Sequence, residues 1–262
     1  MMEQVLRYHS QDGVVTLTLT RPDLHNPFGA ALMQALNTAL DQLEQETALR
    51  VVVLAAQGMS FSTGFENEWL LQLSQHANAE TFSAEATELS RLLARLDQLP
   101  VPVIARVQGS AFGVGLALIA CADVAIAVPE ALFGFSDVKL GWAPAVIAPY
   151  VQRAIGTRAT RRYFVTAERF NARKAKRLGL IHQIVAANEL DHTVNMLIQH
   201  VKHNSPQAIA AAKRLLHELE TPRLDETVQQ RLIALTAENS QQAQAQEGLQ
   251  AFVERRKPSW SI

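Results

Sequence analysis

Cysteine is almost absent from this sequence, and its scarcity excludes several kinds of site. Cys121 is the only cysteine in 262 residues, so the chain cannot form an internal disulfide, and a cysteine-rich zinc site is implausible. We expect Cys121 to be a small buried residue, as unpaired cysteines commonly are. No metal site is predicted.

An excess of charge of either sign is also missing. The 24 lysines and arginines nearly balance 25 aspartates and glutamates, which gives a formal net charge of -1. Such a chain exerts no overall attraction on nucleic acid or anionic lipid. An anionic small ligand would therefore have to be held by a local site.

Long apolar runs are lacking too. No stretch of 18 apolar residues could cross a bilayer, and residues 1–10 lack the basic region and apolar run of a secretory signal. We expect a soluble, cytoplasmic protein with no membrane partner.

The sequence does contain alternating strand and helix patterns, within a composition that is 48% hydrophobic. Apolar runs and period-two alternation predict strands over 14–19, 51–55, 103–107 and 124–128. Helical spacing predicts helices over 30–44 and 81–99, and a third that runs from the glycine-bearing turn at Gly109 through Cys121. This alternation favours an α/β fold in which helices cover a sheet.

The pattern becomes purely helical after residue 185. Helices are predicted over 189–203, 207–220, 224–239 and 241–256, with Pro206 and Pro222 between them. We therefore divide the chain into a core, 1–185, and a helical C-terminal region, 186–262. Helical tails with mixed faces pack on their own core or on a neighbouring subunit, so we expect an oligomer.

Two glycine-bearing loops could hold a negatively charged oxygen. In residues 107–115 a strand passes through small residues directly into an apolar helix, and residues 56–66 form a second glycine turn after a strand. Enolate and acyl-transfer chemistry uses two preorganised N–H donors of this kind. On the local pattern alone, an ordinary helix start explains the first loop as well as an anion site does, and an ordinary surface turn explains the second loop slightly better than an anion site does.

Four segments resemble motifs of the crotonase (enoyl-CoA hydratase/isomerase) superfamily. They are residues 61–66 (Phe-Ser-Thr-Gly-Phe-Glu), the glycine-rich segment 109–123, residues 131–141 and the C-terminal segment 252–257. The resemblance implies a spiral of ββα units with a helical C-terminal trimerisation region, assembled as a homotrimer or a hexamer made of two trimers.

The same resemblance implies particular roles for residues of this chain. The backbone N–H groups of Phe65 and Val114 would form an oxyanion hole for an acyl-CoA thioester, within loops whose glycines, Gly64 and Gly113, approach the ligand. Coenzyme A would be part of the substrate, and no separate cofactor is expected. Arg21 and Lys257 are candidates for contacting its adenine nucleotide.

Two departures limit the reaction that the resemblance implies. Standard enoyl-CoA hydratases use two glutamates; Ala117 stands at the first position, and Asp137, with a shorter side chain, stands at the second. We expect hydration of crotonyl-CoA by the standard two-acid route to be slow or absent. Residues 105–109, 144–151 and 161–170, together with Trp69, look most like bacterial methylglutaconyl-CoA hydratases.

The leading interpretation is therefore hydration of an enoyl-CoA with a branched or carboxylated acyl group. One carboxylate also suffices for a Δ3,Δ2-enoyl-CoA isomerase, and a non-catalytic acyl-CoA binder is a third reading. Lys139 is a candidate partner for a substrate carboxylate, although a surface lysine is the simpler account.

A local basic segment raises the question of RNA. Residues 158–177 contain Arg158, Arg161, Arg162, Arg169, Arg173, Lys174, Lys176 and Arg177 against Glu168 alone. Phosphate neutralisation requires only a patch, but the aromatic residues there, Tyr163, Phe164 and Phe170, are predicted as helix core. We do not expect nucleic acid to be a partner.

Overall fold

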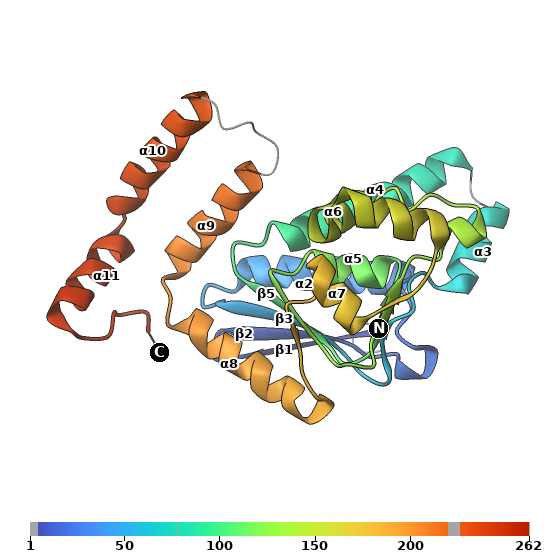
Figure 1. Ribbon diagram of the computed structural model, residues 1–262, viewed down its shortest axis with the longest axis horizontal. Coiled ribbons are helices and arrows are strands. Elements are labelled where there is room, and N and C mark those ends of the chain that lie inside the picture. Colours follow the sequence, from blue (N-terminus) through green and yellow to red (C-terminus); the bar gives the residue numbers. More distant parts are fainter. Residues whose placement is uncertain (1–4, 77, 220–225, 262) are drawn as a thin grey trace.

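The computed structural model describes residues 5–76, 78–219 and 226–261, which form two sheets covered by helices (Figure 1). The larger sheet contains, in spatial order, β1 (Leu6–Gln11), β2 (Val14–Leu19), β3 (Val51–Ala56), β5 (Val103–Val107), β7 (Val124–Ala127) and β10 (Gln183–Ile184). The smaller sheet contains β4 (Ser60–Ser62), β6 (Ser110–Phe112), β8 (Leu132–Gly134) and β9 (Phe170–Asn171).

The helices follow the strands along the chain. They are α2 (Ala30–Gln45), α3 (Asn67–His76), α4 (Ala79–Asp97), α5 (Val114–Ala120), α6 (Ala148–Thr166), α7 (Ala172–Leu178), α8 (Leu190–Lys202), α9 (Pro206–Glu218), α10 (Glu226–Ser240) and α11 (Ala243–Glu254). A short 3₁₀ helix, η2 (Asp137–Leu140), lies between β8 and α6.

The core repeats one unit three times. β3, β5 and β7 each enter the larger sheet, the next strand (β4, β6 or β8) enters the smaller one, and helices follow before the chain returns. Except for the antiparallel β1–β2 pair, neighbouring strands of the larger sheet are parallel. The predicted α/β spiral of ββα units is thereby confirmed.

Burial explains why these residues form these elements. All six residues of β3 are buried, as expected of a parallel strand covered on both faces. β2 alternates between buried and partly exposed residues, which confirms its predicted period of two. Along α2 the buried residues recur at helical spacing: Leu32, Met33, Ala35, Leu36, Ala39, Leu40 and Leu43.

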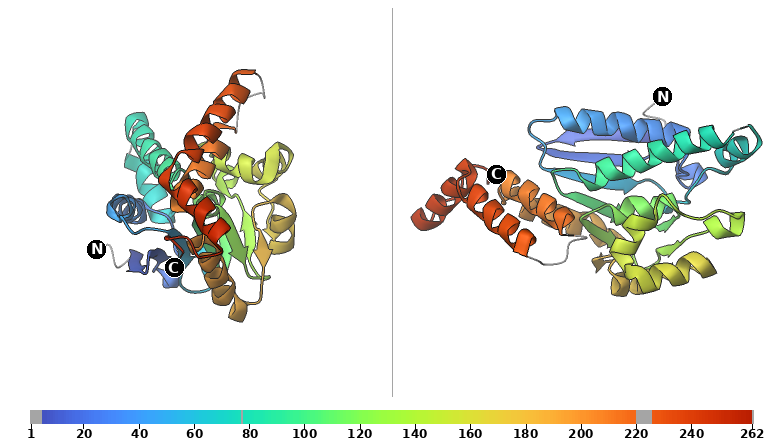
Figure 2. Two further views of the ribbon diagram at one scale, coloured as in Figure 1. Left: turned by 90° about the vertical axis from the view of Figure 1, so that its left-hand side faces the viewer. Right: turned by 90° about the horizontal axis from the view of Figure 1, so that it is seen from above.

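The helical C-terminal region starts on the core and then leaves it. The buried apolar side chains of α8, Leu190, Val194 and Ile198, belong to the main hydrophobic core. Beyond α8, helices α9 to α11 extend away from the sheets (Figures 1 and 2). The projecting part thus begins after α8, whereas the purely helical part of the described chain begins after β10, which ends at Ile184.

Partly buried polar contacts tie the projecting part to the core. Lys213 on α9 donates to the Asp123 carboxylate at 2.5 Å and to the carbonyl of Val101. Arg50, just before β3, donates to the carbonyl of Trp260 near the C-terminus. These contacts link α9 and the end of the chain to the larger sheet.

Some local predictions are corrected. Phe170 lies in β9, where it pairs with Phe133, and is not part of a helix. Tyr163 and Phe164 lie in helix α6, as predicted, whereas no helix is predicted at α3 or α7. Positions 220, 224 and 225 of the predicted helices lie outside the described residues. Cys121 is buried as expected, and burial raises the pKa of its thiol. None of the described helices is long and apolar enough to cross a membrane.

Candidate active site

Three neighbouring strands of the smaller sheet end at the same edge, and a candidate site lies there. β4, β6 and β8 run parallel to one another. β4 is followed by the loop containing Phe65, β6 by the turn at Gly113, and β8 by the segment that leads to Asp137. Ligands commonly bind at the carboxyl ends of parallel strands, and here those ends bring together segments more than 70 residues apart in sequence.

The amide of Phe65 is held in place without a protein partner. Phe28 donates to the carbonyl of Gly64 at 2.7 Å and accepts from the amide of Glu66 at 2.8 Å. These two bonds flank Phe65 in a parallel bridge, so the Phe65 amide points away from Phe28. Among the described residues it donates to no protein acceptor.

The amide of Val114 is similarly unpaired at the start of α5. The amide of Gly113 donates to the carbonyl of Gly134, and the carbonyl of Gly113 accepts from Leu116 and Ala117. Val114 is the first residue of the helix, and the first amides of a helix have no partner within it. No described residue accepts a hydrogen bond from this amide.

Glycine at positions 64 and 113 allows the two loops to touch. Both residues have positive φ, +86° and +51°. A Cβ on Gly64 would lie 3.0 Å from the carbonyl oxygen of Phe112, and a Cβ on Gly113 would lie 3.8 Å from the Cα of Gly64. The loops that carry the two free amides are therefore in direct contact.

Ser62 and Gly115 fix the arrangement beneath these loops. A Cβ on Gly115 would lie 2.4 Å from the Cβ of Ser62, and the fully buried Ser62 hydroxyl accepts a hydrogen bond from the Gly64 amide. The first turn of α5 thus packs directly on the end of β4.

The Asp137 carboxylate lies beside the same loops. It is 7% exposed, and its Oδ2 lies 3.8 Å from the position that a Cβ on Gly113 would occupy. This oxygen is buried and has no hydrogen-bond partner among the described residues. Burial raises the pKa of Asp137 above its ordinary value, because desolvation disfavours the ionised form.

Ala117 supplies no chemistry. Its side chain is fully buried in α5 as part of the hydrophobic core, and it does not line the cavity beside Asp137. The structure thus brings Gly64, Phe65, Gly113, Val114 and Asp137 together, and it places no second carboxylate at position 117.

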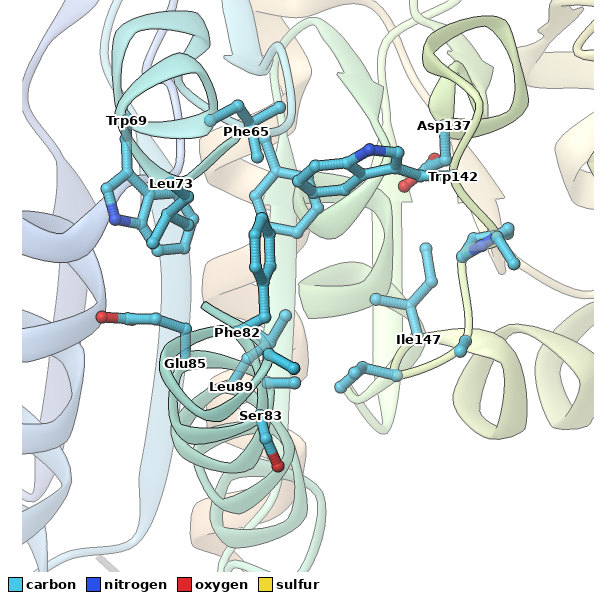
Figure 3. A pocket seen from close by; sticks show the side chains of 17 residues that line it. Phe65, Trp69, Leu73, Phe82, Ser83, Glu85, Leu89, Asp137, Trp142 and Ile147 are labelled. Carbon is cyan, nitrogen blue, oxygen red and sulfur yellow. The ribbon is translucent and has the colours of Figure 1, made fainter. Parts of the chain in front are cut away.

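A cavity of about 410 Å³ opens beside Asp137 (Figure 3). Its lining is mostly apolar and includes four aromatic side chains: Phe65, Trp69, Phe82 and Trp142. The Phe65 and Trp69 rings lie 5.8 Å apart, and the Phe82 and Trp142 rings meet edge to face at 5.5 Å. A cavity of this size and composition is suited to an apolar group larger than a few carbons.

Neither of the two basic residues predicted to contact coenzyme A lines the cavity, and only Arg21 lies near it. Arg21 forms an ion pair with Glu66 at 2.8 Å, next to the loop that carries Phe65. Lys257 is exposed and follows α11, and the C-terminal end of the chain lies at the opposite end of the molecule from α3 and α4 (Figure 1). Within one chain the structure does not bring Lys257 to the cavity.

Sequence reasoning missed most of the cavity wall. Phe82, Glu85 and Trp142 line the cavity, and none was singled out. Phe82 and Glu85 lie on the predicted helix 81–99, and no sequence motif distinguishes them from other residues of that helix. Trp142 reaches the cavity through the turn at Gly141, which has positive φ. Among the described residues no cluster of His, Cys, Asp and Glu is arranged to hold a metal ion.

Comparison with known proteins identifies the family. The family described as "Enoyl-CoA hydratase/isomerase" matches residues 9–261. The chain belongs to this family.

Individual relatives agree with the family match over the whole chain. A solved enoyl-CoA hydratase of Shewanella pealeana is 40% identical, with a TM-score of 0.95 over 98% of this chain and 96% of that one. A solved enoyl-CoA hydratase of Mycobacterium smegmatis is 31% identical, with a TM-score of 0.90 over 98% and 99%. The 1,2-epoxyphenylacetyl-CoA isomerase of Escherichia coli is 30% identical over 100% of this chain and 99% of its own length.

Proposed function

We propose that this member of the enoyl-CoA hydratase/isomerase family hydrates an enoyl-CoA thioester. The thioester oxygen would lie between the amides of Phe65 and Val114, and Asp137 would exchange a proton at the adjacent carbon. The observation that carries this proposal is the meeting of two unpaired amides and one buried, unpaired carboxylate at the same sheet edge.

The two amides supply electrostatic stabilisation. When water adds to an enoyl thioester, negative charge develops on the carbonyl oxygen, and preorganised donors in a water-poor site stabilise that charge. A donor that is already oriented needs no rearrangement during the reaction. The bonds between Phe28 and the residues flanking Phe65 provide this orientation.

Asp137 is suited to holding a proton. Its surroundings raise its pKa towards the range in which a group both accepts and returns protons at neutral pH. Its Oδ2 has no protein partner, so it can face the substrate. As part of this proposal, Gly64 and Gly113 give the thioester access to the backbone.

Isomerisation is the second candidate, and the single carboxylate favours it. Moving a double bond requires one group that removes a proton from one carbon and returns it to another, whereas standard hydration also requires a second group to orient water. The buried Ala117 cannot do so. The solved relatives named as enoyl-CoA hydratases nevertheless support hydration as the first candidate.

We also propose that the chain self-associates as a homotrimer or a dimer of trimers. Side chains on the projecting helices α10 and α11 expose large apolar surfaces: Ile233 (61%), Leu249 (67%), Phe252 (82%) and Val253 (73%). Three of these residues lie at helical spacing on α11, and exposed apolar patches of this kind are typical of interaction sites. Such an assembly would allow Lys257 to reach the cavity of another subunit. Analytical ultracentrifugation would test this by comparing the mass of the wild-type assembly with that of Phe252→Ser, which should be smaller. A monomeric wild type would contradict the proposal.

A panel of enoyl-CoA thioesters tests the function. Straight, branched and carboxylated substrates are scored separately for water addition and for double-bond migration, by mass and by chromatography. Asp137→Asn, which keeps the shape and removes the base, should lower turnover of the preferred substrate by at least about 100-fold. Unchanged turnover would remove Asp137 from the mechanism.

Solvent exchange distinguishes an enzyme from a binder. Saturated acyl-CoA incubated in D₂O should gain deuterium at the carbon next to the thioester if Asp137 works on that carbon. Tight binding without deuterium incorporation or turnover would instead indicate a non-catalytic acyl-CoA binder.

A further inference from the structure

The charge in the acyl cavity has one sign. Its ionisable lining residues are both acidic, Asp137 and Glu85, and every other residue that lines it is uncharged. Among the described residues no lysine, arginine or histidine lines the cavity. An acyl chain that fills this space meets apolar walls and two acids.

The two acids lie on opposite walls. In Figure 3, Glu85 is on the same side as Trp69 and Leu73, whereas Asp137 and Trp142 are on the other side. Glu85 comes from α4, is half-buried and forms no ion pair among the described residues. A thioester placed at the Phe65 and Val114 amides has its reacting carbon beside Asp137, so the distal part of the acyl group is left to the remaining walls.

A carboxylate at the end of the acyl group would be poorly accommodated by these walls. Moving a charge into an apolar cavity is costly unless a cation or hydrogen-bond donors compensate. A like charge nearby adds repulsion, which is stronger in a partly desolvated site than in water. An uncharged chain has neither cost and gains from burial against the aromatic rings.

Two basic residues, one near Asp137 in sequence and one paired beside the Phe65 loop, do not change this balance. Lys139 is exposed and does not line the cavity. Arg21 is paired with Glu66. Neither side chain therefore offers a terminal carboxylate a partner inside the cavity.

We infer that the acyl subsite accepts uncharged, hydrophobic acyl groups and that Glu85 is the specificity-determining residue that rejects acyl groups ending in a carboxylate. This rests on the proposed function, since it assumes that the cavity holds the acyl part of a coenzyme A thioester. The sequence left branched and carboxylated acyl groups open, and this inference excludes the carboxylated ones.

Binding of two saturated acyl-CoA thioesters, which have no double bond to hydrate, tests the inference without measuring turnover. Hexanoyl-CoA and adipoyl-CoA have acyl groups of equal carbon number, and only the second ends in a carboxylate; calorimetry measures both affinities. The wild type should bind hexanoyl-CoA at least about 10-fold more tightly. Glu85→Gln should reduce this preference at least about 5-fold by improving adipoyl-CoA binding alone.

Matched variants guard against indirect effects. Glu88→Gln removes a carboxylate from the same helix, but Glu88 pairs with Arg91 and does not line the cavity, so the preference should stay unchanged. Glu85→Ala should reduce the preference for hexanoyl-CoA as Glu85→Gln does. Agreement between the two variants would show that the loss of charge, and not the shape of the new side chain, causes the change.

The outcomes separate this inference from the function on which it rests. Equal binding of the two thioesters by the wild type, or an unchanged preference in both Glu85 variants, overturns the selection and leaves acyl-CoA binding intact. Failure of both thioesters to bind overturns the proposed function itself, and the inference with it.

Discussion

Gly113 and Asp137 are near neighbours: Oδ2 of Asp137 lies 3.8 Å from the point where a Cβ on Gly113 would be. The residue that bends the chain into α5 therefore also sets the distance between the carboxylate and the Val114 amide. Gly113 combines φ +51° with ψ -121°, a conformation that side-chain-bearing residues rarely adopt.

Gly113→Ala should impair both folding and turnover. Holding alanine in this conformation costs about 1–3 kcal/mol, and relaxation of the turn would move the Val114 amide away from the substrate oxygen. Gly156→Ala is the control, because Gly156 also has positive φ, +77°, and nothing lies within 4 Å of its added Cβ. Thermal melting should show losses in both variants, whereas turnover should fall in Gly113→Ala alone. Equal activity losses would contradict the argument.

Phe82→Ala should change which chain length is preferred. Removing one ring of the Phe82–Trp142 contact enlarges the cavity. Each further buried CH₂ contributes about 0.8 kcal/mol, so longer acyl groups should gain relative to shorter ones. The kcat/KM values for a ladder of chain lengths measure the shift, with Val165→Ala, at an exposed residue of α6 outside the cavity, as the control. An unchanged ladder would show that Phe82 does not bound the acyl subsite.

Lys213→Met should loosen α9 from the core. The substitution leaves Asp123 with the amide of Val103 as its remaining partner. Leaving a charged group short of partners costs about 1–3 kcal/mol, and the lower end applies because the Asp123 side chain is 33% exposed. Limited proteolysis should cut near α9 faster than in the wild type. Arg214→Met, at an exposed neighbour on the same helix, should leave the cleavage rate unchanged.

The long elements of the core could be predicted because each carries its own periodic signal. β2 shows alternation and β3 a continuous apolar run, and both strands lie within one residue of their predicted bounds. The short strands β4, β6 and β8 have three residues each, too few for any period to show. Because those strands position the site, the sequence pattern alone could not assemble it.

The site residues differ in how well they could be predicted from the sequence. The local glycine pattern indicated the two loops, and the roles of Asp137 and of the Phe65 and Val114 amides came from resemblance to family motifs. Only the structure shows that these two amides are unpaired. Trp142 and Glu85 have no local signal, since their place on the cavity depends on how α4 packs against the turn after η2. Tertiary contacts, absent from any single segment, determine these positions.

The buried carboxylate of Asp137 makes a signed prediction about stability and pH. Its pKa is raised in the folded protein by desolvation, so the folded state binds this proton more tightly than the unfolded state does. By linkage, the free energy of unfolding falls as the pH rises from the pKa that Asp137 has in the unfolded chain to its raised pKa in the folded protein. Above the folded-state pKa the whole of this stability has been lost. Asp137→Asn removes that proton exchange. The free energy of unfolding, measured by denaturant titration at several pH values, should therefore differ little between wild type and Asp137→Asn in acid. Towards neutral pH, Asp137→Asn should become increasingly more stable than the wild type. A constant difference across the range would mean that the carboxylate is not desolvated as its burial indicates.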